Sequence, residues 1–303
     1  MIKVIFMGTP DYANEILKTL IEDSEIEVVA VYTQPDKPVG RKKLLTPPPV
    51  KVTTQEANIP VYQPARLREK EVVNKLLEIA CDYIVVAAYG QILPREILDH
   101  APCINLHASI LPQYRGASPI QQTLLNGDKE TGVTAMLMEE GLDTGDILKI
   151  EKVEVADDEM VESLFHRLTQ LAKVLTVDVL KNFNILTPVP QDDSQATHCK
   201  KITKADGEVS FDNAQILFNK YRAFTPWPGV YLSSKLKLKK IALEKTQSKN
   251  EAGKILNIDK DSIVVGCTQG SLRIFRVQPE SKKEMDVLSY INGKRLQVAD
   301  CLS

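Results

Sequence analysis

The sequence predicts an α/β protein with two domains: a Rossmann-like N-terminal domain and a smaller C-terminal domain that is an OB-like β-barrel. Over the first half of the chain, near-continuous apolar segments alternate with helical patterns, which is typical of a parallel sheet covered on both faces. Beyond residue 206, short alternating segments are separated by turn residues, as in small barrels. The 303 residues are enough for two hydrophobic cores.

The first domain is predicted from its apolar strands. Residues 2–6 form the first strand, the turn at 7–10 (MGTP) follows, and the helical spacing of Ala13, Ile16, Leu17 and Leu20 continues the chain. Three more buried strands are predicted at residues 28–32, 83–88 and 103–107. The turn after the first strand contains Gly8 but lacks the other two glycines of the G-x-G-x-x-G pattern, so we expect no NAD site.

A domain boundary is predicted after a long helix at residues 161–183. The segment that follows, LTPVPQDDS, is polar and rich in proline, as linkers are. The predicted division is therefore a first domain at 1–185, a linker at 186–205 and a second domain at 206–303. Short strands are predicted in the second domain at 230–232, 236–243, 253–258, 262–267 and 271–277.

Charge is divided unevenly between the two parts of the chain. Residues 1–205 carry 22 Lys and Arg against 29 Asp and Glu, whereas residues 206–303 carry 16 against 11. A basic domain favours a polyanionic partner, although charge alone leaves a solvated lysine surface as an equal alternative. In residues 235–239 (KLKLK), strand alternation would place Lys235, Lys237 and Lys239 on one face and the leucines on the other.

Composition excludes several classes of protein. No apolar run reaches 18 residues, and the N-terminus has neither a basic n-region nor a small-residue cleavage site, so we expect a cytoplasmic protein without a membrane partner. The five cysteines form no C-x-x-C pair. We therefore expect reduced thiols, no disulfide framework and no bound metal.

One of the four histidines stands out by its position. His107 lies at the carboxyl end of a predicted strand, two residues after Asn105, so both side chains share one face. Ligands of open α/β sheets bind at this edge. Position alone also allows a purely structural histidine. His166 and His198 are expected at or near the surface, and His100 lies in a loop without an obvious partner.

The residues around His107 carry a resemblance to a known family. Asn105-x-His107 is followed by SILPQYRG at 109–116 and by LDTGD at 142–146. Together these motifs resemble those of the folate-dependent formyltransferases. Over essentially the whole chain, the sequence is similar to family members that act on initiator methionyl-tRNA, with matching segments FMGTPDYA (6–13), QPDKPVGRKK (34–43), AYGQILP (88–94) and RAFTPWPG (222–229).

The resemblance implies that Asn105, His107 and Asp143 are catalytic. In such a reaction an amine attacks a formyl carbon, an oxyanion develops, and a proton moves from the amine toward N10 of the departing folate. The Asn105 amide and the protonated His107 ring would donate hydrogen bonds to the oxyanion. Asp143 would hold the imidazolium and help to relay the proton through water, and which member of this coupled pair takes the first proton stays open.

The resemblance also implies the two substrates. The formyl donor would be 10-formyltetrahydrofolate, with no metal. Its pterin pocket would be bordered by the turn at Ser109, Ile110, Leu111 and Pro112 and by the backbone of Tyr89, Gly90, Gln91, Ile92 and Leu93. Ile110 stands where the family usually has leucine, a change that conserves volume.

The acceptor implied by the resemblance is initiator methionyl-tRNA, and no DNA partner is expected. Arg41, Lys42 and Lys43 would lie on a loop that reaches the acceptor end, and the second domain, with Lys235, Lys237 and Lys239, would contact the tRNA. Arg115 either braces its turn or contacts substrate. Trp227 is expected to pack inside the second domain rather than to stack on a base.

Two other functions compete with this interpretation. A formyltransferase of the same catalytic core could act on a sugar nucleotide or another small amine, and an RNA-binding module could keep the fold without the activity. Residues 206–303 are of a size that disfavours the first alternative. The presence of Asn105, His107 and Asp143 disfavours the second, because a binding module does not need all three.

Overall fold

The computed structural model describes residues 1–40 and 42–302. The chain divides into two compact units. Unit 1 comprises Met1–Pro119, Glu130–Glu154 and Phe165–Cys199, and unit 2 comprises Ile120–Lys129, Val155–Leu164 and Lys200–Ser303. Unit 2 thus includes two short segments from the earlier part of the sequence, which the hydrophobic pattern did not indicate.

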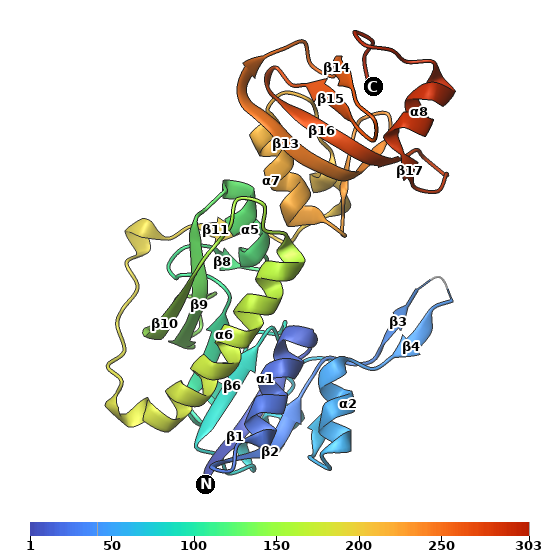
Figure 1. The fold of residues 1–303 in the computed structure, drawn as a ribbon. Helices are drawn as coiled ribbons and strands as arrows, with labels where there is room; N and C mark the ends of the chain where they lie inside the picture. The colour runs from blue at the N-terminus through green and yellow to red at the C-terminus, as the bar shows by residue number, and fades with distance from the viewer. Residues whose placement is uncertain (41, 303) are drawn as a thin grey trace. The chain divides into compact units, whose positions relative to one another are not determined.

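Unit 1 is built on a seven-stranded sheet (Figure 1). The strand order is β10-β9-β7-β6-β1-β2-β5. The strands β5, β2, β1, β6 and β7 pair in parallel, whereas β9 pairs antiparallel with both β7 and β10. The predicted parallel-rich, Rossmann-like sheet is therefore confirmed, and the four predicted strands are β1, β2, β6 and β7. The bounds are β1 (Ile2–Gly8), β2 (Ile26–Tyr32), β5 (Val61–Tyr62), β6 (Tyr83–Ala87), β7 (Cys103–His107), β9 (Glu130–Leu137) and β10 (Ile147–Glu154).

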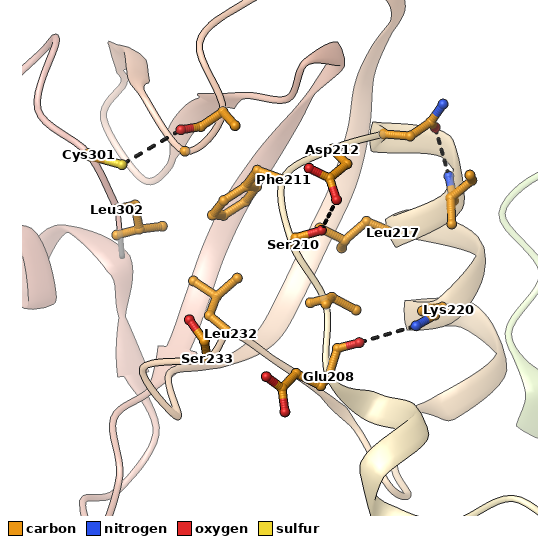
Figure 2. A pocket seen from close by; sticks show the side chains of 15 residues that line it. Glu208, Ser210, Phe211, Asp212, Leu217, Lys220, Leu232, Ser233, Cys301 and Leu302 are labelled. Carbon is orange, nitrogen blue, oxygen red and sulfur yellow. Dashed lines mark hydrogen bonds between the residues drawn. The ribbon is translucent and has the colours of Figure 1, made fainter.

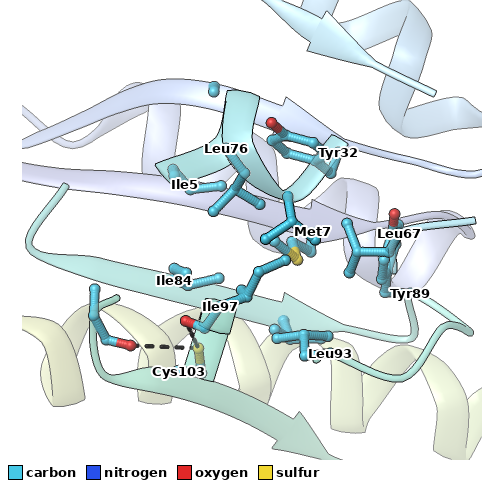
Figure 3. Close-up of a cluster of buried hydrophobic side chains, with 14 residues drawn as sticks. Ile5, Met7, Tyr32, Leu67, Leu76, Ile84, Tyr89, Leu93, Ile97 and Cys103 are labelled. Atoms are coloured by element: carbon cyan, nitrogen blue, oxygen red, sulfur yellow. Dashed lines mark hydrogen bonds between the residues drawn. The ribbon is translucent and has the colours of Figure 1, made fainter. Parts of the chain in front are cut away.

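Helices cover both faces of this sheet because its strands are apolar on both sides. Ile5 and Met7 of β1 belong to a buried cluster with residues of α3 and α4 (Figure 3). Val4 and Phe6, on the opposite face by strand alternation, are fully buried as well, and α1 packs against β1, β2 and β6. The helices of unit 1 are α1 (Asp11–Glu22), α2 (Pro49–Glu56), α3 (Lys70–Leu77), α4 (Arg95–Leu98) and most of α6 (Val161–Asn182), whereas α5 (Pro119–Asn126) lies almost entirely in unit 2.

Short elements complete unit 1. The predicted long helix is confirmed as α6, and its Leu168, Ala172, Leu175 and Val179 are almost completely buried at the predicted helical spacing. In the segment predicted as a linker, β11 pairs with β8 of the same unit. The short elements are β3 (Lys37–Val39), β4 (Leu44–Thr46), β8 (Arg115–Gly116), β11 (His198–Cys199), η1 (Phe183–Ile185) and η2 (Asp193–Gln195).

Unit 2 contains an antiparallel sheet, as the short alternating segments predicted. Its order is β12-β13-β16-β15-β14, with β17 paired to β16, and α7 packs against β12, β13 and β16. The elements are η3 (Lys204–Gly207), α7 (Ala214–Phe224), β12 (Val230–Tyr231), β13 (Lys237–Lys249), β14 (Ile255–Ile258), β15 (Ile263–Gly266), β16 (Gln269–Gln278), β17 (Met285–Asp286) and α8 (Val287–Lys294).

The predicted lysine face of unit 2 is only partly formed. Strand β13 begins at Lys237, so Lys235 lies before it, with a left-handed φ of 65°. Lys237 is exposed and Leu238 is buried, as alternation requires, but Lys239 is half-buried. The physical reason is an irregularity in the pairing with β16 between Leu238 and Lys240, which interrupts the two-residue period.

Two further observations describe the chain as a whole. Within residues 1–40 and 42–302, no helix combines the length and the apolar character needed to cross a membrane. All five cysteines are free, and Cys103, Cys199 and Cys267 are buried. Burial raises the pKa of the Cys103 and Cys267 thiols to about 12, so these groups stay protonated near neutral pH.

Candidate active site

Asn105 and His107 lie at the carboxyl end of β7, on the same face of the strand. β7 pairs in parallel with β6 on one side and antiparallel with β9 on the other, where His107 lies opposite Thr134. His107 is only 7% exposed, and Asn105 is half-buried. The fold therefore places an amide and an imidazole at the edge of the sheet where ligands of α/β proteins bind.

Asp143 reaches these two side chains from the loop between β9 and β10. Its Oδ2 lies 3.6 Å from Nδ1 of His107, and its Oδ1 accepts a hydrogen bond from Nδ2 of Asn105 at 3.3 Å. The backbone N–H of Gly116 donates to Oδ2 at 2.8 Å. The structure thus brings together the three residues that the motifs singled out, from segments 38 residues apart in the sequence.

His107 is held between two hydrogen-bond acceptors. While Nδ1 faces the Asp143 carboxylate, Nε2 lies 2.9 Å from the backbone carbonyl oxygen of Tyr114. The Tyr114 contact has the length of a hydrogen bond, whereas the 3.6 Å separation from Asp143 is longer than one. The structure thus places an imidazole beside a carboxylate, a pair of groups that serves general acid–base chemistry in many enzymes.

The turn after β7 is fixed by hydrogen bonds that leave little of it accessible. Oγ1 of Thr134 donates to the Ser109 carbonyl at 2.6 Å and accepts from the Leu111 N–H at 3.1 Å. Ser109 and Leu111 are buried, whereas Ile110 and Pro112 are half-buried. Of the four residues predicted to border the pterin, Ile110 and Pro112 are the two whose side chains a ligand can reach.

The second segment predicted to border the pterin presents mainly its backbone. Tyr89 and Leu93 point into the core cluster of Figure 3, with 1% and 3% exposure. Gln91 is turned inward, since its Oε1 accepts from the Leu67 N–H at 2.7 Å and its Nε2 donates to a carbonyl. Gly90 has a φ of 79°, and Ile92 is 81% exposed. A ligand here would therefore meet backbone groups and the apolar Ile92 side chain.

Arg115 braces its turn from the inside. The side chain is 4% exposed, and its guanidinium donates to Oε1 of Gln191 and to Oδ1 of Asp193. Of the two roles left open by the sequence, the structure supports the brace. Gln191 was missed in the sequence, because it lies in an irregular polar segment that carries no periodic signal. Its Nε2 donates to the backbone carbonyls of Asp143 and Gly145, at 2.9 and 2.8 Å.

The basic residues predicted to bind tRNA belong to two different parts of the chain, the turn between β3 and β4 and the segment that leads into β13. Arg41 lies outside the described residues, whereas Lys42 and Lys43 are exposed between β3 and β4. In unit 2, Nζ of Lys235 lies 3.8 Å from a carboxylate oxygen of Glu208 and 5.2 Å from the centroid of the Tyr231 ring. Lys235 is therefore partly neutralised, while Lys237 extends into solvent.

Two smaller expectations need correction. Trp227 does not pack inside the second domain: its side chain is 60% exposed, whereas Ala223 and Phe224 of the same segment are buried. His100 does have a partner, since its Nε2 lies 3.0 Å from the Ile79 carbonyl oxygen. The exposure of Trp227 and the His100 contact could not be predicted from local sequence, because both depend on how distant segments pack.

A hollow of about 590 Å³ lies within unit 2 and has a different character (Figure 2). Phe211, Leu217 and Leu302 are among the apolar side chains that line it. Nζ of Lys220 donates to the Glu208 carbonyl, so this cation is already engaged by the protein. The hollow is an apolar groove and does not reproduce the amide, imidazole and carboxylate grouping of unit 1.

Clusters of metal-binding side chains are absent from the part of the chain that the structure describes. Over residues 1–40 and 42–302, no group of three or more His, Cys, Asp and Glu side chains is arranged to hold an ion. Asn105, His107 and Asp143 together offer an amide donor, an imidazole and a carboxylate, which are groups suited to acyl transfer to an amine.

A parallel-rich α/β unit with this cluster, joined to a β-rich unit, defines a group-transfer enzyme of the formyltransferase class. The chain belongs to the formyl transferase family: residues 2–180 match the model of the formyl transferase domain, and residues 201–295 match the model of the formyl transferase C-terminal domain. Its curated relatives include the methionyl-tRNA formyltransferase of Sulfurimonas denitrificans, 69% identical over 99% of this chain and 100% of the relative. That of Campylobacter jejuni is 48% identical over the full length of both chains.

Solved structures show the same fold at low sequence identity. An N-formyltransferase from Helicobacter canadensis, in complex with folinic acid and dTDP-3-aminofucose, covers 92% of this chain and 100% of its own, with a TM-score of 0.67 at 17% identity. HypX from Aquifex aeolicus, in complex with tetrahydrofolic acid, covers 99% of this chain and 48% of its own, with a TM-score of 0.60 at 15% identity. At these identities the likeness concerns the fold alone.

Proposed function

We propose that this protein transfers the formyl group of 10-formyltetrahydrofolate to the free amino group of methionine on initiator methionyl-tRNA, in the cytoplasm. The observation that carries the proposal is the full-length similarity to relatives named methionyl-tRNA formyltransferase, at 48 to 69% identity. The similarity spans both units of the chain. The neighbours that act on sugars are only about 17% identical.

The geometry of the cluster supports a direct transfer. The methionine amine attacks the formyl carbon, a tetrahedral intermediate forms, and the C–N10 bond then breaks as N10 takes a proton. One N–H of the Asn105 amide bonds Asp143, and the second can point at the oxyanion. A protonated His107 ring, beside the Asp143 carboxylate and the Tyr114 carbonyl, would add positive charge near the same oxygen. Asp143 would receive the amine proton through water and pass it on toward N10.

The folate proposal rests on the two segments beside the cluster. Ile92 and Ile110 are apolar side chains that a ligand can reach, and the backbone around Gly90 offers hydrogen-bonding groups. An apolar edge combined with backbone donors and acceptors suits a flat heterocycle such as a pterin. A neighbour solved with tetrahydrofolic acid has the same fold, which is consistent with a reduced folate as the carrier.

The tRNA proposal rests on charge. We propose that residues 1–185 form the catalytic domain and that residues 206–303 contact the tRNA, joined by the linker at 186–205. Arg41, Lys42 and Lys43 would approach the acceptor end, and Lys235, Lys237 and Lys239 would add phosphate contacts. Of the last three, Lys237 is the most favourable candidate, because Lys235 is paired with Glu208 and Lys239 is half-buried.

The test is formyl transfer in vitro with three acceptors. The protein would be given 10-formyltetrahydrofolate together with initiator methionyl-tRNA, an elongator aminoacyl-tRNA or a dTDP-amino sugar, and Asp143→Asn would serve as the inactive control. Formylation of initiator methionyl-tRNA by the unmodified protein alone would support the proposal. Formylation of the sugar with no product on tRNA would overturn it.

A further inference from the structure

The Asp143 loop has an unusual backbone that needs an external support. Asp143 has a φ of 55°, in the left-handed region that residues other than glycine rarely adopt. At Gly145 the loop runs close against the backbone of Leu137, where a Cβ would lie 1.9 Å from the Leu137 carbonyl oxygen, so only glycine fits. A strained conformation of this kind persists only where surrounding contacts determine it.

Gln191 supplies such contacts from a distant part of the chain. Its side-chain amide donates one hydrogen bond to the Asp143 carbonyl oxygen at 2.9 Å and one to the Gly145 carbonyl oxygen at 2.8 Å. Both donors of the amide are thus used on the two residues that flank Thr144. The segment itself is anchored close by, because Val189 and Ile147 exchange backbone hydrogen bonds of 2.9 and 2.8 Å.

The acceptor end of the Gln191 amide is fixed as well. Its Oε1 accepts two hydrogen bonds from the Arg115 guanidinium, at 3.1 and 2.8 Å, and Asp193 pairs with the same guanidinium at 2.8 Å. The residue after Arg115, Gly116, donates its backbone N–H to the Asp143 carboxylate at 2.8 Å. Arg115, Gln191, Asp143 and Gly116 therefore form a closed ring of contacts.

We propose that Gln191 is a positioning residue for the transfer, which fixes the Asp143 backbone so that the carboxylate meets both His107 and Asn105. This inference rests on the proposed function. The contacts of the carboxylate are long, at 3.6 Å to His107 Nδ1 and 3.3 Å to Asn105 Nδ2, so a small displacement of the loop breaks them. A displacement of about 1 Å costs on the order of 100-fold in rate when it misaligns catalytic groups. Gln191 acts through Asp143 and touches no reacting atom.

The test compares two substitutions at Gln191 with a matched control. Gln191→Glu keeps an acceptor for Arg115 but removes the two donors, and Gln191→Leu removes both functions. Gln195→Leu is the control, because Gln195 lies in the same segment, is exposed and donates to Asp192 at 2.7 Å. We expect kcat to fall roughly 10- to 100-fold in both Gln191 variants. The KM for folate and for tRNA should stay within about twofold, and Gln195→Leu should behave as the unmodified protein, because only interactions made in the transition state are lost.

A second readout does not depend on turnover. Amide hydrogen exchange at Gly116 reports the bond to the Asp143 carboxylate, and we expect it to speed up about tenfold or more in Gln191→Glu while exchange in β1 and β6 stays unchanged. A purely structural role would instead loosen the whole sheet.

The outcomes separate this inference from the proposed function. If the unmodified protein formylates no tRNA, the proposed function fails, and the exchange at Gly116 still decides whether Gln191 holds the loop. If the unmodified protein is active and Gln191→Glu keeps its full kcat, the positioning role is overturned. A rise in KM with unchanged kcat overturns it too. If Gln191→Leu fails to fold, Gln191→Glu alone decides, since it keeps the partner of Arg115.

Discussion

The reactive cluster and the basic turn between β3 and β4 are built in opposite ways. His107 and Asp143 are 7% and 9% exposed, and each contacts partners from several segments of unit 1. Lys42 and Lys43 are exposed on a two-stranded hairpin, next to Leu44 and Leu45, which are 65% and 68% exposed. The fold therefore fixes the side chains of the cluster before any substrate binds, whereas the side chains of the turn are exposed to solvent and can act mainly through their charge. Substitutions in the cluster should change the rate of the chemical step, and substitutions in the turn should change binding in a salt-dependent way.

The largest effect is expected for Asp143→Asn. The substitution keeps the shape of the side chain but removes the charge that faces His107 and the acceptor of a transferred proton. We expect kcat for formyl transfer to fall by about 10³-fold or more, which is the scale of losing an acid–base group and its electrostatic partner together. Single-turnover assays at saturating tRNA would measure it, with thermal unfolding as the control for folding. A variant with more than a tenth of the normal kcat would remove Asp143 from the mechanism.

His107→Ala comes next. It removes the cation beside the proposed oxyanion but leaves the Asn105 amide in place, so we expect kcat to fall roughly 10²- to 10³-fold. The Kd for initiator methionyl-tRNA, measured by filter binding, should change by less than about threefold, because the ring acts mainly in the transition state. If His107→Ala weakened tRNA binding as much as it lowered kcat, the cluster would not be distinguished from the turn by its effect on catalysis.

Arg222→Met is expected to lower the stability of the protein without lowering its kcat. Arg222 is 3% exposed and donates to the carbonyls of Ala156 and Leu124 and to Oδ1 of Asn219, all within unit 2. Desolvation lowers the pKa of its guanidinium. We expect the substitution to lower the free energy of unfolding by about 2 to 4 kcal/mol, because buried carbonyls lose their donors.

The measurement for Arg222→Met is urea unfolding followed by circular dichroism, together with kcat well below the melting temperature. Unchanged kcat in a destabilised protein is the expected result. If kcat fell as far as in His107→Ala while stability stayed normal, burial would be a poor guide to which residues support the fold and which support the reaction.

The sequence predicts those parts of the molecule whose structure is determined by neighbouring residues in the chain. The strands β1, β2, β6 and β7 follow from apolar runs, and Asn105 and His107 share a face because strand side chains alternate. The proximity of Asp143 to them was expected from the family motif and not from any periodicity. Gln191 could not be found in this way, because its role depends on where an irregular segment crosses the Asp143 loop. The exposure of Trp227 was missed for the same kind of reason: residues that fill a core are decided by packing between distant segments.

The smallest effect is expected at the basic turn, for the double substitution Lys42→Ala with Lys43→Ala. Removing two exposed charges should raise the KM for initiator methionyl-tRNA several-fold and leave kcat and folate binding unchanged, since the reactive cluster is untouched. Each phosphate contact that is lost should also reduce the slope of log affinity against log salt by roughly one. The matched control is Lys152→Ala, because Lys152 is also exposed but already pairs with Glu130. A double variant whose KM and salt slope equal those of this control would mean that exposed charge in the turn does not contact the tRNA. The acceptor would then have to be recognised by the second unit, beginning with Lys237.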